Sequence, residues 1–339
     1  MLDDLKYIHE RDQQDALGIA EKQWQQLSYE FNLEIEPFTP KNIVFSGMGG
    51  SALAALLSTT WPSCNIPFEI CRNYEIPKYV SNETLFISSS YSGNTEETLS
   101  ALKEAQNKNA FIAVISSGGQ LKETAQTNKY PILLLPPNLQ PRMATLYSFK
   151  ALITLLFKLN IISDLSELEN TSKFIEESVK SWRPDVPSSQ NQAKKIALDL
   201  VGKTPVIYSG SVLAPAAYKW KINFNENAKN VAWWNQYPEF NHNEFLGWSS
   251  HPVDKPYAII DLRSDYDNPQ IKKRFDVSNK LLSGKRPEPI TVLAKGDNVL
   301  EQLVYMVVLG DFVSLYLALL NGLNPTPVDL IEKLKTNLS

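Results

Sequence analysis

One stretch decides the fold of this chain: Phe86-Ile-Ser-Ser-Ser-Tyr-Ser-Gly-Asn-Thr-Glu-Glu-Thr-Leu99. It starts as the end of an apolar strand and continues into helix-start chemistry, after which apolar spacing resumes at Leu99. Between strand and helix lie the hydroxyl side chains of Ser88, Ser89, Ser90, Ser92 and Thr95. Together with the free N–H groups of the following helix, such donors suit a phosphate dianion. The turn has no lysine, which excludes a Walker loop.

Composition limits the class of protein. A length of 339 residues favours two domains at about 100 to 200 residues each. A hydrophobic content of 43% and a charged content of 21% are typical of a soluble globular protein and argue against disorder. The net charge of −4 gives no basic field, so we expect no nucleic-acid partner. Cys64 and Cys71 are too few for a disulfide scaffold, which predicts the reducing cytoplasm.

Two segments bear on targeting and membranes. Residues 1–9 are acidic and interrupted by charges, unlike a secretory signal peptide. Residues 299–323 are nearly continuous hydrocarbon, but Glu301, Gln302 and Asp311 would lie inside any membrane span, where charges are costly. We therefore predict a buried helix there and no membrane partner.

Strands and helices alternate along most of the chain. We expect a strand that begins at Asn42, strands at 67–71, 84–88, 110–116 and 130–135, and helices after the turn at 47–51, at 96–107 and at 144–159. The same alternation returns later, with strands at 205–211, 257–262 and 289–294 and helices at 212–224 and 268–283. This rhythm predicts an α/β fold of two doubly wound parallel sheets that begin alike, at Val44–Ser51 and Val206–Ser211.

The domain limits follow from the same pattern. Amphipathic helices at 3–32 and the first sheet make up residues 1–159. Residues 160–192, which contain prolines and runs of Gln, Asn and Ser, form a helical connector. Residues 193–339 then hold the second sheet and the C-terminal helices.

The glycine turn after the first strand fits a dinucleotide or a phosphate site. Gly47-x-Gly49-Gly50-Ser51 departs from the dinucleotide fingerprint, because Ala52 stands where a third glycine belongs. Glu69 lies at about the distance of the ribose-binding acid, but the fit is loose.

Several motifs in order along the chain carry a family resemblance. They are Gly47-Met-Gly-Gly-Ser51, Ser90-Tyr-Ser-Gly-Asn-Thr95, Pro141-Arg142, Asn225-Glu-Asn-Ala-Lys229, Phe240-Asn-His-Asn-Glu244 and Pro327-Val-x-x-Ile-x-x-Leu-Lys335. From about residue 40 onward the chain resembles the bifunctional phosphoglucose/phosphomannose isomerases, a branch of the sugar isomerase (SIS) domain proteins. The resemblance implies two flavodoxin-like SIS domains with flanking helices.

The resemblance also implies where the sugar phosphate binds. Ser90, Ser92 and Thr95 would hold the phosphate, with Gly50 and Ser51 beside the sugar. The alternative is that these hydroxyls only cap the helix that follows, as Ser and Thr commonly do.

Four further residues carry the chemistry that the resemblance implies. Glu226 would move a proton between C1 and C2 through a cis-enediol(ate), and Arg142 would stabilise the charge of that intermediate. His242 would protonate the ring oxygen during ring opening, from a loop that reaches a neighbouring subunit. Lys335 would assist ring opening; Lys333 is a rival, but the Ile-x-x-Leu-Lys spacing selects Lys335. Without the family pattern, each of these residues has a simpler interpretation as a solvated surface group.

We therefore expect a cytoplasmic homodimeric enzyme of carbohydrate metabolism, placed in glycolysis and gluconeogenesis. It would interconvert glucose 6-phosphate, and mannose 6-phosphate with it, with fructose 6-phosphate. We expect no metal and no cofactor, because three histidines and two cysteines form no ligand cluster in the sequence. Two alternatives are a non-catalytic SIS protein that binds a sugar phosphate to regulate a partner, and an aminosugar-forming isomerase. The second would normally carry an ammonia-generating domain, for which this chain has no room.

Overall fold

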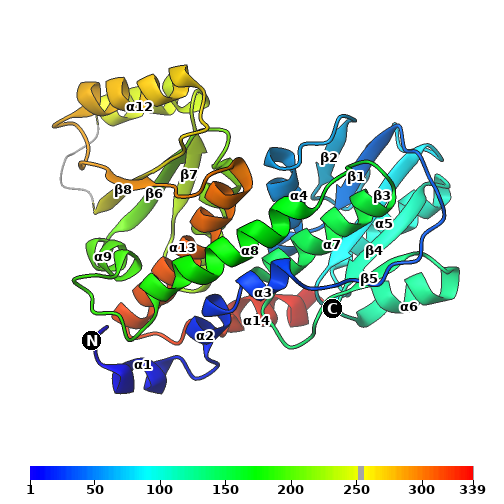
Figure 1. Cartoon of the computed structure of the whole chain (residues 1–339), viewed down its shortest axis with the longest axis horizontal. Coiled ribbons are helices and arrows are strands. Elements are labelled where there is room, and N and C mark those ends of the chain that lie inside the picture. Colours follow the sequence, from blue (N-terminus) through cyan, green and yellow to red (C-terminus); the bar gives the residue numbers. More distant parts are fainter. Residues whose placement is uncertain (251–255, 339) are drawn as a thin grey trace. The chain divides into compact units, whose positions relative to one another are not determined.

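The computed structural model describes residues 1–250 and 256–338, and the chain forms two compact units (Figure 1). The first-sheet unit comprises residues 23–173, and the second-sheet unit combines residues 1–22 with 174–339. These limits differ from the expected domains at both ends of the first one. The N-terminal residues belong to the second-sheet unit, where the Tyr7 hydroxyl donates to the Leu319 carbonyl at 2.7 Å.

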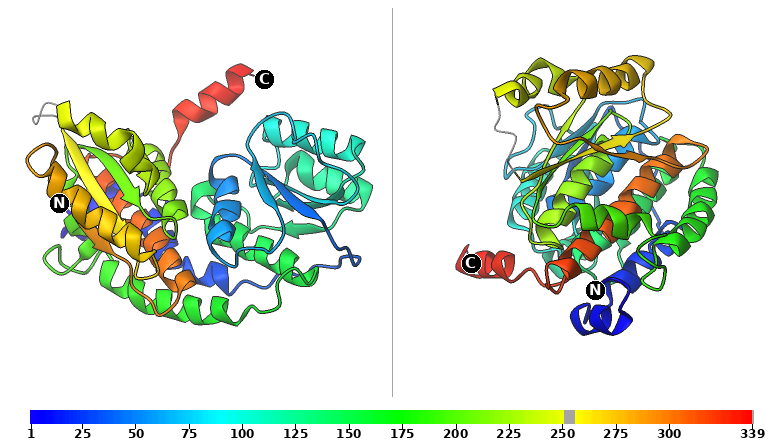
Figure 2. Two further views of the ribbon diagram at one scale, coloured as in Figure 1. Left: turned by 90° about the horizontal axis from the view of Figure 1, so that it is seen from above. Right: turned by 90° about the vertical axis from the view of Figure 1, so that its left-hand side faces the viewer.

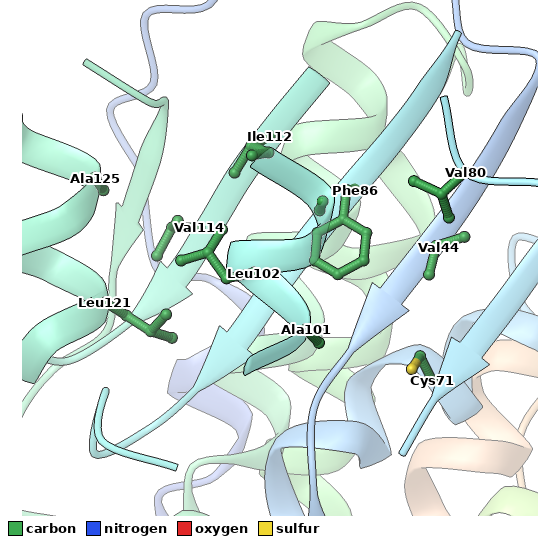
Figure 3. Packing of buried hydrophobic residues seen from close by; sticks show 11 residues of the cluster. Val44, Cys71, Val80, Phe86, Ala101, Leu102, Ile112, Val114, Leu121 and Ala125 are labelled. Atoms are coloured by element: carbon green, nitrogen blue, oxygen red, sulfur yellow. The ribbon is translucent and has the colours of Figure 1, made fainter. Parts of the chain in front are cut away.

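The first-sheet unit is built on five parallel strands in the order β2-β1-β3-β4-β5. The strands are β1 (Asn42–Ser46), β2 (Phe68–Cys71), β3 (Thr84–Ser90), β4 (Phe111–Ser116) and β5 (Ile132–Leu134). The helices are α3 (Trp24–Leu27), α4 (Gly49–Thr60), α5 (Glu96–Asn107), α6 (Gly119–Asn128), the 3₁₀ turn η1 (Pro141–Met143) and α7 (Thr145–Lys158). A parallel sheet needs helices on both faces. On one face, Phe86 of β3 lies among apolar side chains of β1, β4 and α5 (Figure 3).

The second-sheet unit repeats this plan with four parallel strands in the order β7-β6-β8-β9. The strands are β6 (Thr204–Ser209), β7 (Trp233–Gln236), β8 (Tyr257–Arg263) and β9 (Ile290–Leu293). Its helices include α1 (Leu5–Arg11), α2 (Ala16–Glu21), α9 (Gln192–Asp199), α10 (Ala214–Glu226), α11 (Glu244–Gly247), α12 (Pro269–Leu282), α13 (Val299–Leu320) and α14 (Asp329–Leu338). Helix α8 (Ser166–Val179) runs across the unit limit, and short 3₁₀ turns are η2 (Lys180–Trp182), η3 (Glu239–His242) and η4 (Trp248–Ser250). The matching strand orders confirm the α/β prediction of two parallel sheets.

Helix α13 confirms the prediction of a buried apolar helix at this position. It is long and apolar enough to cross a membrane, but almost all of its residues are buried within the protein. Asp311 forms a buried ion pair with Lys219 of α10 and accepts a hydrogen bond of 2.6 Å from the Asn223 amide. This pairing neutralises a carboxylate that would be costly to bury alone.

Several elements were not expected from the sequence. Helices α6, α9 and α11 had no assignment, and Trp233 and Trp234 begin the edge strand β7, which was also not predicted. Strand β7 pairs in parallel with β6, where Val206 lies opposite Trp233. The amphipathic helices expected at 3–32 are three short helices, the last of which ends at Leu27.

The close packing of α10 on α13 predicts the effect of one substitution. Gly310 lies against the indole of Trp220, whose Nε1 donates to the Met306 carbonyl at 2.7 Å. A methyl group at position 310 would overlap this fixed ring. We expect Gly310→Ala to destabilise the protein by about 2 kcal/mol, because overpacking outweighs the better helix propensity of alanine. Thermal unfolding followed by circular dichroism measures the change.

Gly247→Ala is the matched control, because a Cβ there meets open space. We expect that variant to unfold at or slightly above the wild-type temperature. Equal unfolding temperatures for the two variants would contradict the packing argument.

Candidate functional site

The hydroxyl turn begins where β3 ends. The Ser90 hydroxyl lies 2.7 Å from that of Thr95 and 3.3 Å from that of Ser92, and it accepts the backbone N–H of Gly93 at 3.1 Å. Gly93 has a φ of +72°, which glycine adopts without strain. Ser90 is buried while Ser92 is exposed, so the hydroxyls run from the sheet toward solvent.

Thr95 decides between a phosphate site and a simple helix cap. It is the N-cap residue of α5, yet its side chain accepts no capping hydrogen bond within the described chain and turns to Ser90 instead. The Met48 N-cap of α4 likewise provides no side-chain cap among the described residues. Both helices therefore present first-turn N–H groups without a side-chain acceptor, which is the arrangement that binds anions.

The glycine turn lies beside the hydroxyl turn. Strands β1 and β3 are neighbours and parallel, so the turns that follow them meet at the carboxyl edge of the sheet. The Ser51 hydroxyl accepts the backbone N–H of Tyr91 at 3.0 Å and joins the two turns. A Cβ on Gly50 would lie 2.9 Å from the backbone nitrogen of Arg142, so only glycine allows this approach of α4 to η1.

The burial of Arg142 excludes the simpler interpretation of this residue as a solvated surface arginine. Only 1% of it is exposed, and it sits in η1 against the first turn of α4. Its Nη1 donates to the Gln140 side chain at 3.3 Å. The structure thus brings together six of the predicted residues at one edge of the first sheet: Gly50, Ser51, Ser90, Ser92, Thr95 and Arg142.

Glu226 lies in the second-sheet unit. It is the last residue of α10, which runs two residues beyond the predicted end at 224, and it is half-buried. Its carboxylate-bearing side chain lines a cavity of about 710 Å³. The polar neighbours in this cavity include Lys221, Asn225 and Lys229, and the other walls are largely apolar.

Hydrogen bonds hold the chain that directly follows Glu226. Asn227 donates to the Ser314 hydroxyl of α13 at 2.9 Å. The ammonium group of Lys229 donates to the carbonyls of Asn227, Asn324 and Pro325 at 3.0 to 3.2 Å. The end of α10 therefore has a defined position within its unit.

His242 ends η3 and is exposed. Nearby, Glu244 accepts hydrogen bonds from the Tyr208 hydroxyl and from the Asn235 amide. Burial, together with the Glu244 carboxylate, strongly raises the pKa of Tyr208, so this phenol is a permanent donor. Sequence reasoning missed Tyr208 and Asn235, because their contacts with Glu244 join residues far apart in the chain.

Lys335 has no described contact with Glu226 or His242. Its ammonium group pairs with Glu332 of the same helix at 2.8 Å, and both side chains are largely exposed. Within its unit, α14 extends away from the sheet and its neighbouring helices (Figure 2), and none of its described residues is buried. Leu330 and Ile331 of α14 line the Glu226 cavity, but Lys335 does not.

The side chains that commonly ligate metals are dispersed over the fold. Within residues 1–250 and 256–338, no group of three or more His, Cys, Asp or Glu side chains lies close enough to hold a metal ion.

Known proteins resemble this sequence. Residues 189–338 match the family described as the bacterial phospho-glucose isomerase C-terminal SIS domain. A bifunctional phosphoglucose/phosphomannose isomerase from Caldicellulosiruptor bescii is 38% identical over 302 residues, covering 88% of this chain and 89% of that protein. The protein of the same name from Aquifex aeolicus is 34% identical and covers 88% and 90%.

A solved structure shares the fold. The glucose-6-phosphate isomerase like protein from Thermus thermophilus superposes with a TM-score of 0.67 and 18% identity, over 98% of each chain. The sequence relatives span nearly the full length of this chain at more than 30% identity. The chain therefore belongs to the bifunctional phosphoglucose/phosphomannose isomerase family.

Proposed function

We propose that this protein interconverts glucose 6-phosphate and mannose 6-phosphate with fructose 6-phosphate, as a metal-independent aldose–ketose isomerase. Membership of the family supports the reaction. The orientation of the Thr95 hydroxyl is the observation that supports a sugar phosphate as the substrate. The hydroxyl turns to Ser90 and leaves the start of α5 uncapped by a side chain within the described chain. A cytoplasmic location is part of the proposal, in keeping with two cysteines that are free thiols.

The phosphate binds at the hydroxyl turn. Ser90, Ser92 and Thr95 donate hydrogen bonds to its oxygens, and the first-turn N–H groups of α5 supply further donors. Gly50 and Ser51 contact the sugar from the neighbouring turn. The bound ligand is then a hexose held by its 6-phosphate, with C1 and C2 directed toward the catalytic groups.

Glu226 carries out the proton transfer. Its carboxylate takes the proton from C2 of the open-chain aldose and returns it to C1, while a proton moves from O2 to O1. Arg142 stabilises the charge of the intermediate cis-enediolate. Glucose and mannose 6-phosphates differ only at C2, which is planar in this intermediate, so both lead to fructose 6-phosphate.

Ring opening comes first, and it needs a proton at the ring oxygen. His242 supplies it, with Lys335 assisting. The protein acts as a homodimer in which His242 serves the site of the partner subunit. The exposed position of the imidazole at the end of η3 supports a role across an interface.

The phosphate role of Thr95 predicts a selective loss of substrate affinity. Thr95→Val keeps the shape of the side chain but removes the hydroxyl. We expect the KM for glucose 6-phosphate to rise about tenfold, the value of one hydrogen bond to a charged group. Thr98→Val is the control, because its buried hydroxyl on the same helix has no partner among the described residues. Equal KM values for the two variants, measured in a coupled assay, would exclude this phosphate role.

Glu226 separates an enzyme from a sugar-phosphate sensor. We expect Glu226→Gln to lower kcat by at least about a hundredfold, because an amide is not a base. Binding of glucose 6-phosphate, measured by calorimetry, should persist. Glu177→Gln is the control on an exposed residue of α8. Near-wild-type turnover by Glu226→Gln would rule out the proposed mechanism.

The role of His242 across subunits predicts complementation. Homodimers of His242→Ala and of Glu226→Gln should each be inactive. Mixed dimers then hold one site with both native residues, so random exchange should restore about a quarter of wild-type activity. No recovery despite subunit exchange, checked by native mass spectrometry, would place His242 in its own subunit's site.

A further inference from the structure

The side chain before His242 is bound firmly to α12. The amide of Asn241 donates to the Ser278 hydroxyl at 2.8 Å, and its oxygen accepts from the Arg274 guanidinium at 3.1 Å. Asn241 therefore uses both ends of its side chain in contacts with one helix. These contacts fix the backbone immediately before the imidazole.

The side chain of Glu244 is bound to the sheet. One carboxylate oxygen accepts the Tyr208 hydroxyl of β6, and the other accepts the Asn235 amide of β7 at 2.8 Å. The Tyr208 oxygen in turn accepts the indole N–H of Trp248 at 3.0 Å. Glu244 thus joins the loop to two neighbouring strands through both of its oxygens.

A cluster of buried aromatic rings, Tyr208, Tyr237 and Phe240, packs against the same loop. Phe240 is fully buried, and its ring centroid lies 4.4 Å from that of Tyr208 and 5.0 Å from that of Tyr237. The buried guanidinium of Arg286 lies 5.6 Å from the Phe240 ring and 5.3 Å from the Tyr208 ring. Because a cation–π contact is stronger in a desolvated position, the Arg286 guanidinium stabilises the packing of these rings.

His242 itself differs from these neighbours. Its imidazole is exposed, and no described residue forms a hydrogen bond with it. The structure therefore holds the chain on both sides of this residue and leaves its two ring nitrogens available. Such an arrangement is what a loop needs in order to present one reactive group in a fixed place.

We propose that Asn241 and Glu244, which we call the His242 clamp, are positioning residues that hold the imidazole in place for opening of the sugar ring. The inference rests on the proposed function and deepens it. The clamp residues act through the backbone of His242 and touch neither the sugar nor its reacting atoms. Losing a clamp contact therefore slows ring opening, because the imidazole then samples orientations that are unproductive.

Ring opening can be measured separately from isomerisation. Exchange NMR follows the interconversion of the α and β anomers of glucose 6-phosphate, which needs an open ring but no proton transfer at C2. The full-length protein carrying Glu226→Gln serves as the parent, because it should catalyse anomerisation without isomerisation. Into this parent we would introduce Glu244→Ala, Asn241→Ala and Glu244→Gln, the last of which keeps an oxygen for the Tyr208 hydroxyl.

The control is Glu288→Ala in the same parent. Glu288 is an exposed carboxylate between α12 and β9, with a 3.3 Å contact to the Ser283 hydroxyl. We expect both clamp alanine variants to lose about 10- to 100-fold in catalysed anomerisation, and Glu244→Gln to recover part of it. Glu288→Ala should match the parent. Unfolding temperatures measured on the same samples show whether each variant is folded. If Glu244→Ala does not fold, the anomerisation rate of Asn241→Ala tests the positioning role.

Two outcomes are kept apart by assaying the wild type in parallel. If folded clamp variants anomerise glucose 6-phosphate as fast as Glu288→Ala does, the positioning role is overturned. This holds even if the wild type is a fully active isomerase. Absence of fructose 6-phosphate formation by the wild type would instead refute the proposed function, and the clamp inference would fall with it.

Discussion

The 2.7 Å contact between the hydroxyls of Ser90 and Thr95 is the interaction on which the proposed phosphate site at the carboxyl edge of the first sheet depends. Because Thr95 turns toward the strand, it leaves the first turn of α5 without a side-chain cap in the described chain. Neutral hydroxyl donors and a helix N-terminus are then available for phosphate binding, a task to which a Walker loop also contributes a lysine. The Ser51 hydroxyl extends this arrangement by bonding to Tyr91, which ties the glycine turn to the same edge.

The second-sheet unit repeats the sheet but has different chemistry. Its proposed functional groups are the carboxylate of Glu226, the imidazole of His242 and the ammonium group of Lys335, and contacts fix the backbone beside the first two. Helix α10 is held to α13 by the buried pair of Lys219 and Asp311, and the loop of His242 is held by the clamp. In the proposed mechanism, one copy of the fold supplies donors for the phosphate, and the other supplies groups that move protons.

Local signals were sufficient for much of this account. The hydroxyl turn and the limits of α5 at 96–107 agree with prediction, because strand end, cap and helix start are adjacent in sequence. Strand β7 was missed because it is defined by pairing with β6 and not by an apolar run of its own. The binding of Glu244 by Tyr208 and the packing of residues 1–22 in the second-sheet unit also arise only from contacts between distant parts of the chain.

The central claim is that one enediolate serves two epimeric substrates. The most direct test is the rate of fructose 6-phosphate formation by the wild-type protein from glucose 6-phosphate and from mannose 6-phosphate, followed by NMR. The account predicts that both sugars yield fructose 6-phosphate, since the configuration at C2 is lost in the shared intermediate. Binding of both sugars with no fructose 6-phosphate formed from either would contradict it, and would indicate a sensor in place of an enzyme.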